Sequence, residues 1–261
     1  MLAEIATMGT VFTLSVADQN GAETVDHIEG GWELLVERAT TELARIDAVF
    51  STYRSDSEVS RWRRGERGVC SDDLDEVISL CETARDLSDG YFDPWAVPGG
   101  FDPSGLVKGW AAERVLGMMV TAGVSEAVVN GGGDIAIHSD TPINVGIRHP
   151  HHADRLCGVV QTNTAVATSG LYERGCHVVN PFGGELGAFA ATVVGAPLYL
   201  ADALATAVIA GGMRVLERIG QEGSFRGLLI THDETMHALP GTVLSLADLQ
   251  GSQGLPEGSL N

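Results

Sequence analysis

Asp202 and Thr206 stand four residues apart in the segment ADALATA. In a helix this spacing places both side chains on one face. A carboxylate and a hydroxyl suit a hard cation such as Mg²⁺, which takes one or two carboxylate ligands and fills its other positions with water and substrate phosphates. The pair therefore predicts a divalent-cation site. A second interpretation stays open, in which Asp202 faces solvent near a helix start and Thr206 only packs.

The segment DPSGLVKG, residues 102–109, leads from a loop into a helix and combines a carboxylate with a lysine. The free N–H groups and the positive end of a helix favour phosphate, and Lys108 is one of only 16 basic residues in the chain. The segment therefore indicates an anion cradle. An ordinary junction in which Asp102 caps the helix explains it equally well.

Three consecutive glycines in NGGGD, residues 130–134, follow a short apolar run. Glycine adopts positive φ and lets the backbone approach a ligand closely. However, the pattern lacks the spacing of a dinucleotide-binding loop, and a tight turn between two strands accounts for it equally well.

His177 lies in a β-like run, CHVVNP, and another polar segment, TSG, precedes it at 168–170. Its imidazole titrates near neutral pH, so we consider it as a general base, although a lone histidine in a strand is more often a hydrogen-bonded core residue. Tyr53 is either a stacking partner for a planar ring or an aromatic at the surface. The arginines that follow it are more often a solvated patch than a site.

The net charge of the chain excludes some classes of binding partner. Sixteen Lys and Arg against 35 Asp and Glu give a formal net charge of −19. This field repels nucleic acid and anionic lipid, so we expect neither as a partner. It also opposes a phosphorylated ligand, so a phosphate site requires local positive charge from a lysine, a metal ion or backbone N–H groups.

Composition also bears on the compartment. No apolar run reaches the roughly 18 residues needed to cross a bilayer, because the stretch 196–213 contains Asp202. The first 16 residues carry no basic region typical of a secretion signal. The four cysteines have no CxxC spacing and are expected as free thiols. We therefore expect a cytoplasmic protein without a membrane span.

Apolar spacing predicts helices over 32–50, 73–87, 108–120 and 199–210, with Ser71 and Asp72 as candidate caps for the second. Short β-rich runs between 127 and 196 predict a sheet, and a strand is expected at the N-terminus. A hairpin turning at Asp233 and Glu234 follows. We expect one domain over residues 1–249 and a loose tail over 250–261.

The order of these segments along the chain resembles the ApbE family, the FAD:protein FMN transferases. The matching segments are MGT at 8–10, FSTYRSDSEVSR from 50, FDP at 92–94, DPSGLVKG at 102–109, NGGGDI from 130, VGIRHP from 145, ATSG at 167–170, HVVNP from 177 and ADALATA from 201. The resemblance covers about residues 8–212, and its last motif is the most specific.

The resemblance implies a mixed α+β fold of the T-fold type, with a mostly antiparallel sheet, flanking helices and FAD in a cleft. It implies Mg²⁺ held by Asp202, Thr206 and a backbone carbonyl at Gly105. His177 matches the family's candidate base. The positions that match family contacts to FAD are Met8, Tyr53, Tyr91, Phe92, Asp93, Asp102, Lys108 and, through its backbone, Val179.

The implied activity is Mg²⁺-dependent transfer of FMN from FAD to a Ser or Thr hydroxyl of an acceptor flavoprotein, with release of AMP. The same residues suit two other functions. One is a Mg²⁺-dependent FAD pyrophosphatase that yields FMN and AMP. The other is a FAD-binding protein without turnover.

The chain departs from the family pattern in four places. The usual DLGGIAKG appears as DPSGLVKG, and Asn180 replaces the aspartate of the HIIDP-like motif, which removes a charge beside the candidate base. Ala205 stands where a carboxylate ligand often precedes the threonine. The segment between FDP and DPSG is shorter than in many members, which affects one wall of the flavin cleft.

Overall fold

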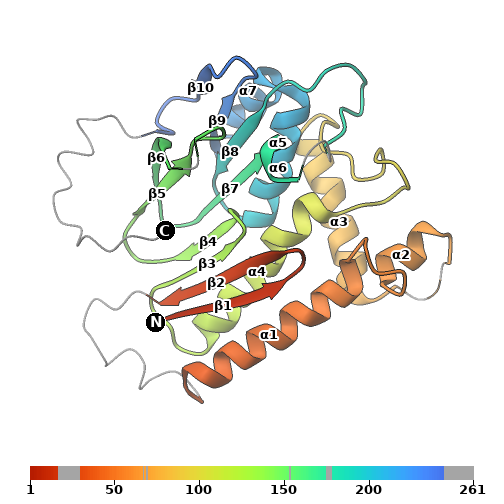
Figure 1. The fold of residues 1–261 in the computed structure, drawn as a ribbon, viewed down its shortest axis with the longest axis vertical. Coiled ribbons are helices and arrows are strands. Elements are labelled where there is room, and N and C mark those ends of the chain that lie inside the picture. Colours follow the sequence, from red (N-terminus) through yellow and green to blue (C-terminus); the bar gives the residue numbers. More distant parts are fainter. Residues whose placement is uncertain (17–29, 67, 69, 153, 175–177, 244–261) are drawn as a thin grey trace.

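Figure 1 shows the computed structural model of the chain, which describes residues 1–16, 30–66, 68, 70–152, 154–174 and 178–243. The strands are β1 (Leu2–Thr7), β2 (Thr10–Val16), β3 (Ala127–Gly131), β4 (Ile135–His138), β5 (Ile143–Arg148), β6 (Leu156–Thr162), β7 (Ala165–Gly170), β8 (Ala190–Val194), β9 (Arg226–Ile230) and β10 (Met236–Ala238). Among these residues, one eight-stranded sheet has the order β1-β2-β3-β4-β7-β8-β9-β10, and β5 and β6 form a separate hairpin. Every pairing between these strands is antiparallel, which confirms the predicted sheet type.

The helices cover one face of the large sheet. They are α1 (Gly31–Phe50), α2 (Glu58–Arg63), α3 (Asp72–Leu87), α4 (Ser104–Thr121), α5 (Leu171–Arg174), α6 (Leu198–Gly211) and α7 (Met213–Gln221). Helix α4 contacts β3 and β4, helix α6 contacts β7 and β8, and the two helices contact each other behind the sheet (Figure 1). Across the described part of the chain, none of the helices combines the length and the apolar character that a bilayer span needs.

The predicted amphipathic helices form as expected. Helix α1 buries Leu35, Ala39, Leu43, Ile46 and Phe50, the five positions that the helical period marks as apolar. The apolar faces of these helices build one core with the sheet.

The cap predicted for the second helix also forms. Helix α3 begins after Ser71, whose hydroxyl accepts a hydrogen bond from the N–H of Leu74 at 3.3 Å. Of the two candidate caps, Ser71 is therefore the one used, and Asp72 is the first residue of the helix.

The structure differs from the sequence prediction at elements whose bounds are set by turns. The N-terminal segment is a hairpin rather than one strand, because Met8 and Gly9, with φ of 51° and 69°, reverse the chain between β1 and β2. Helix α4 begins at Ser104 rather than near Lys108, since the preceding Pro103 suits a helix start. Strand β4 and helices α2 and α7 are short and were not predicted.

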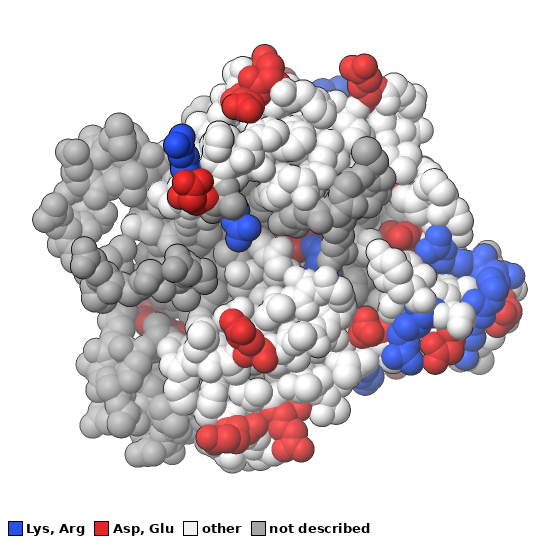
Figure 2. All heavy atoms as spheres, viewed as in Figure 1, with Lys and Arg blue, Asp and Glu red and all other residues white. Residues whose placement is uncertain are grey.

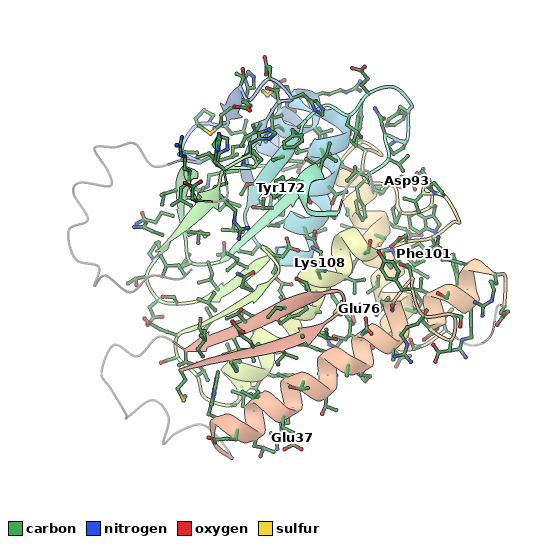
Figure 3. All side chains as sticks on the ribbon, viewed as in Figure 1. Glu37, Glu76, Asp93, Phe101, Lys108 and Tyr172 are labelled. Atoms are coloured by element: carbon green, nitrogen blue, oxygen red, sulfur yellow. The ribbon has the colours of Figure 1, made fainter. Side chains whose placement is uncertain are left out.

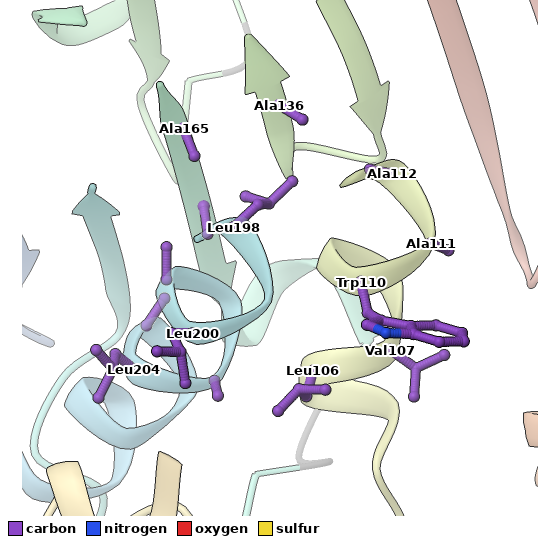
Figure 4. Packing of buried hydrophobic residues seen from close by; sticks show 14 of the residues in the cluster. Leu106, Val107, Trp110, Ala111, Ala112, Ala136, Ala165, Leu198, Leu200 and Leu204 are labelled. Atoms are coloured by element: carbon purple, nitrogen blue, oxygen red, sulfur yellow. The ribbon is translucent and has the colours of Figure 1, made fainter. Parts of the chain in front are cut away.

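Helices α4 and α6 approach so closely at Gly109 that no side chain fits between them. A Cβ atom at Gly109 would lie 2.9 Å from the carbonyl oxygen of Leu198 and 2.9 Å from the Cα of Tyr199. Figure 4 shows the apolar side chains of the two helices packed beneath Ala136 of β4 and Ala165 of β7. Glycine at this position therefore sets the spacing between the two helices.

The sheet is weakly joined in its middle. Strands β4 and β7 pair through only two residue pairs, Ile135 with Val166 and Ala136 with Ala165. In contrast, β7 pairs with β8 along its length from Val166 to Gly170. The last part of β7 therefore runs past the start of β4, and the candidate site described below lies at this point.

Two glycines of α4 provide a test of the helix contact. We expect Gly109→Ala to lower the free energy of unfolding by about 1–3 kcal/mol, because the added methyl group meets backbone atoms that cannot move aside. Gly117→Ala is the matched control on the same helix, since its Cβ would meet nothing within 4 Å. It should raise stability by up to about 1 kcal/mol through helix propensity. Urea unfolding of both variants measures the difference, and equal effects would contradict the close contact.

Candidate functional site

A cleft opens where β7 runs past the start of β4. Its walls come from the loop before α4, the first turns of α4, the end of β7, the segment 178–179 and helix α6. The sequence-predicted residues that line it are Tyr91, Phe92, Asp93, Asp102, Gly105, Lys108, Val179, Asp202 and Thr206. The fold thus brings together most of the predicted site from four separate segments of the chain.

Asp202 lies in α6 at the bottom of the cleft and is 1% exposed, so the solvent-facing interpretation is wrong. Its Oδ2 accepts a hydrogen bond from the N–H of Gly109 at 3.2 Å. Both carboxylate oxygens lie 3.5 Å from the Nζ of Lys108. A buried carboxylate requires such compensating partners, and here both come from α4.

Thr206 places its hydroxyl beside the start of α4. The Thr206 hydroxyl lies 3.2 Å from that of Ser169 at the end of β7. A Cβ atom at Gly105 would lie 3.1 Å from the Thr206 Oγ1, so a side chain there would crowd the hydroxyl. The glycine leaves this backbone segment open toward Thr206 and Asp202.

The oxygen atoms in the cleft restrict the kind of cation that could bind. No three His, Cys, Asp or Glu side chains within the described ranges gather into a metal-binding group. A cation here would depend on the carboxylate of Asp202, the hydroxyl of Thr206 and backbone oxygen near Gly105. This sparse set fits Mg²⁺, which retains water and substrate oxygens, and it does not fit a closed zinc site of Cys and His.

Lys108 carries positive charge into the middle of the molecule, between helix α5, which bears Tyr172, and the loop that bears Asp93 (Figure 3). Its ammonium forms an ion pair with the carboxylate of Asp134, which is fully buried. Asp134 is a residue of the site that the sequence motifs did not predict. The signal that could have found it is a carboxylate directly after a tight glycine turn.

The loop before α4 forms one wall of the cleft despite its short length. Phe101 packs edge-on against Trp62 of α2, with 5.1 Å between ring centroids, and its ring lies tilted against that of Trp95 at 5.2 Å. Pro94 and Val97 of the same loop line the cleft. The shortened segment therefore still closes this wall, through aromatic packing against α2.

The two acidic residues of this loop have structural partners of their own. Asp102 accepts a hydrogen bond from the N–H of Ser104, the first residue of α4, at 3.0 Å, but Pro103 rather than Asp102 holds the N-cap position. Asp93 pairs with Arg85 at 3.1 Å and accepts a hydrogen bond from the N–H of Trp95. Both side chains also face the cleft, so neither contact excludes a role with a ligand.

A second pocket adjoins the cleft, and Lys108 and Thr168 line both. Its other walls include Thr10, Asn130, Gly132 and Gly133 on one side and strand β5, up to Arg148, on the other. Gly132 and Gly133 lie in the turn between β3 and β4, as one interpretation of the sequence held, and both also line this pocket.

Three sequence-predicted residues are not placed in the cleft. Met8 lies at the β1–β2 turn, partly buried against the core, and its neighbours Gly9 and Thr10 line the second pocket. Tyr53 follows α1 and is 93% exposed. His177 falls outside the described residues.

Basic side chains gather over α2 on the face shown in Figure 2. Arg54 pairs with Asp56 at 3.1 Å, and Arg64 pairs with Glu66 at 2.8 Å. Arg63 donates hydrogen bonds to the carbonyls of the loop before α4. These partners fit a solvated patch that braces the loop, rather than a separate anion site.

Glu113 of α4 fixes the start of α6, the helix that carries Asp202. Its carboxylate accepts a hydrogen bond from the N–H of Leu198, the first residue of α6, at 2.5 Å. A carboxylate at a helix N-terminus satisfies a free donor and interacts favourably with the helix dipole. Burial nevertheless raises the pKa of Glu113, and the hydrogen bond from Leu198 opposes that shift only in part.

Comparison with known proteins identifies the family. The family model described as the ApbE family matches residues 8–99 and 96–225, which is more than half of the chain. The chain belongs to the ApbE family. This confirms the resemblance drawn from the order of the sequence motifs.

This ApbE-family chain is similar to two curated relatives and to one solved structure. It is 37% identical over 166 residues to a UPF0280 protein of Archaeoglobus fulgidus, covering 60% of this chain and 67% of that one. It is 28% identical over 170 residues to the FAD:protein FMN transferase of Rhodobacter capsulatus, covering 59% of this chain but only 32% of that one. Its fold matches the flavin transferase ApbE from Vibrio cholerae with a TM-score of 0.75 at 18% identity, over 92% of this chain and 97% of that chain.

The raised pKa of Glu113 leads to a prediction for pH dependence. Because the folded protein holds the Glu113 proton more tightly than the unfolded chain, this group's contribution to stability is fully present below its usual pKa of 4.5. It is lost as the pH rises through the raised value. Glu113→Gln keeps a hydrogen-bond acceptor for Leu198 and removes the titration, so it should gain stability relative to wild type as the pH rises.

Urea unfolding between about pH 4 and pH 8 measures this difference. The matched control is Glu37→Gln, which removes an exposed carboxylate from α1. The expected result is that the free energy of unfolding of Glu113→Gln rises relative to that of wild type as the pH rises. A difference that stays constant with pH, or that changes in favour of wild type as the pH rises, would contradict the burial effect.

Proposed function

We propose that this ApbE-family protein transfers FMN from FAD to a Ser or Thr hydroxyl of an acceptor flavoprotein, releases AMP, and requires Mg²⁺. The observation that carries the proposal is the meeting of Asp202, Thr206 and Lys108 in one cleft, formed by the close contact of α4 with α6. The name of the R. capsulatus relative, FAD:protein FMN transferase, supports the same reaction.

The donor atoms of the cleft fit a divalent cation. Asp202 and Thr206 lie one helical turn apart on α6, and the open backbone at Gly105 faces the Thr206 hydroxyl. We propose these three residues as the ligands, with the carbonyl of Gly105 as the backbone donor. When bound there, Mg²⁺ would neutralise charge on the pyrophosphate of FAD.

The remaining residues of the cleft would orient FAD. The ammonium of Lys108 supplies positive charge for phosphate within a protein of net charge −19. Tyr91 and Phe92 supply apolar surface for a ring system, and Tyr91 is itself held against Phe182 at 4.9 Å between centroids. Asp102 and Asp93 line the same wall and are proposed as polar contacts to the dinucleotide. Val179 of the segment 178–179 lines the same cleft, and its backbone is proposed as a further contact to FAD.

The chemical step would be an attack of the acceptor hydroxyl oxygen on the FMN-side phosphorus. A new O–P bond forms, the bond from that phosphorus to the bridging oxygen breaks, and AMP leaves with the bridging oxygen. The hydroxyl proton passes to a base, for which His177 is the proposed residue. If water replaced the hydroxyl, the same arrangement would yield FMN and AMP.

Asn180, the residue that departs from the family's aspartate, has a role in local structure. Its side-chain oxygen accepts a hydrogen bond from the N–H of Phe182 at 3.1 Å, and its amide nitrogen donates to the carbonyl of Glu185 at 3.2 Å. A carboxylate could not make the second of these bonds. The amide thus shapes the turn that presents Val179 to the cleft.

Transfer is tested by incubating the protein with FAD, Mg²⁺ and candidate acceptor proteins, followed by mass spectrometry of the acceptor. A mass increase that corresponds to FMN on a Ser or Thr, with release of AMP, is the expected result. Release of AMP and FMN without an adduct would assign the pyrophosphatase activity instead. FAD that stays intact during long incubation with Mg²⁺ would indicate binding without turnover.

The assignment of Asp202 is tested by titrating FAD with and without Mg²⁺. We expect Asp202→Ala to weaken Mg²⁺-dependent FAD binding by about 1–3 kcal/mol, because a charge-assisted contact is lost. Asp140→Ala is the matched control, since Asp140 is exposed in the β4–β5 turn and lies outside the cleft. A titration of Asp202→Ala that matches wild type would remove Asp202 from the site.

A further inference from the structure

The carboxylate of Asp134 is a buried acidic group to which the transfer reaction assigns no task. It is 0% exposed and lies where the β3–β4 turn meets strand β4. Its own backbone carbonyl accepts a hydrogen bond from the N–H of Gly131 at 2.8 Å. The side-chain oxygen of Asn130 accepts another from the N–H of Gly133 at 2.8 Å. These bonds close the turn and fix the position of Asp134.

The turn is also held from outside. A Cβ atom at Gly132 would lie 2.3 Å from the Thr10 Oγ1, and one at Gly131 would lie 2.7 Å from the ring of Phe12. Gly132 adopts a φ of 72°, which side chains rarely allow. The turn therefore lies tight against β2, and it directs the Asp134 carboxylate at Lys108 from a rigid base.

Lys108 faces two buried carboxylates that are not equivalent. Its ammonium is in direct contact with Asp134, whereas both oxygens of Asp202 lie 3.5 Å from it. Asp202 has a further donor in the N–H of Gly109 at 3.2 Å. The two carboxylates and one ammonium carry a formal charge of −1, so this group favours a further cation.

We propose that Asp134 is a positioning residue that holds the ammonium of Lys108 at the boundary of the two pockets and limits its approach to the Asp202 oxygens to the long contact of 3.5 Å. The oxygens of Asp202 then remain available to a divalent cation, while Lys108 remains available to phosphate. The proposal rests on the proposed function only in its assignment of the cation site to Asp202.

The physical reason is competition for one carboxylate. Among the carboxylates that the structure describes in contact with Lys108, Asp202 is the one that remains when Asp134 is removed, and a closer approach strengthens their attraction. The ammonium would then occupy the face of Asp202 that a cation needs. Asp134 thus separates two positive charges that would otherwise compete for one partner.

The first test is a titration with Mn²⁺ alone, followed by the electron paramagnetic resonance signal of the free ion. Asp134→Asn keeps the shape of the side chain and removes its charge. We expect its Kd for Mn²⁺ to rise about tenfold over wild type, as for other residues that support a ligand without touching the metal. Asp140→Asn, an exposed control, should bind as wild type does.

A double variant separates positioning from a general effect on folding. In Lys108→Met with Asp134→Asn the competing ammonium is absent, so Mn²⁺ affinity should return to within about twofold of wild type. A merely structural role for Asp134 would leave the double variant as weak as the single one. That result, or wild-type affinity in Asp134→Asn, would overturn the proposal.

Lys108→Met alone keeps the test decisive if Asp134→Asn does not fold. It should bind Mn²⁺ at least as tightly as wild type, because the loss of the ammonium removes a competitor of the cation and leaves the Asp134 and Asp202 carboxylates with a more negative summed charge. Weaker binding by this variant, or no Mn²⁺ binding by wild type, would overturn the proposal. FMN transfer is not among these readouts. A protein that binds Mn²⁺ as described and transfers no FMN would contradict the proposed function and leave the role of Asp134 supported.

Discussion

The close contact of α4 with α6 at Gly109 is the constraint on which the site depends. Because Gly109 has no side chain, the backbone of α4 comes near enough to donate its N–H to the carboxylate of Asp202. The same approach brings Gly105 beside Thr206 one turn earlier in α4. The candidate cation ligands are therefore placed by helix packing, and the apolar core that holds the helices together also holds these oxygens in register.

The proposed ligand-binding cleft contains few charged side chains, and the net charge of the chain determines what they must do. The net charge of −19 opposes any dinucleotide, so binding needs a compact local source of positive charge. Lys108 is that source among the residues lining the cleft, and two buried carboxylates surround it. Since the summed charge of Lys108, Asp134 and Asp202 is negative, the proposed cation and the phosphate of the proposed substrate would each favour binding of the other. Neither partner alone balances the site.

The sequence predicted what local periodicity and spacing determine. The buried face of α1, the Ser71 cap and the Asp202–Thr206 pair on one helix face all follow from a helical repeat. Asp134 was missed as a site residue, because its partner Lys108 is distant along the chain and meets it only through packing, so the glycine turn before it was its one local signal. The early start of α4 and the Met8–Gly9 reversal were missed for a different reason, since short turns leave little periodic signal.

The two residue pairs that join β4 to β7 divide the large sheet into two mechanical halves. One half comprises β1 to β4 and the other β7 to β10, with α4 seated on the first and α6 on the second. Because so few backbone hydrogen bonds cross this seam, the rigidity of the molecule there rests on the helix pair behind it. Any relative rotation of the two halves would widen or narrow the cleft directly, so the sheet itself sets the width of the site.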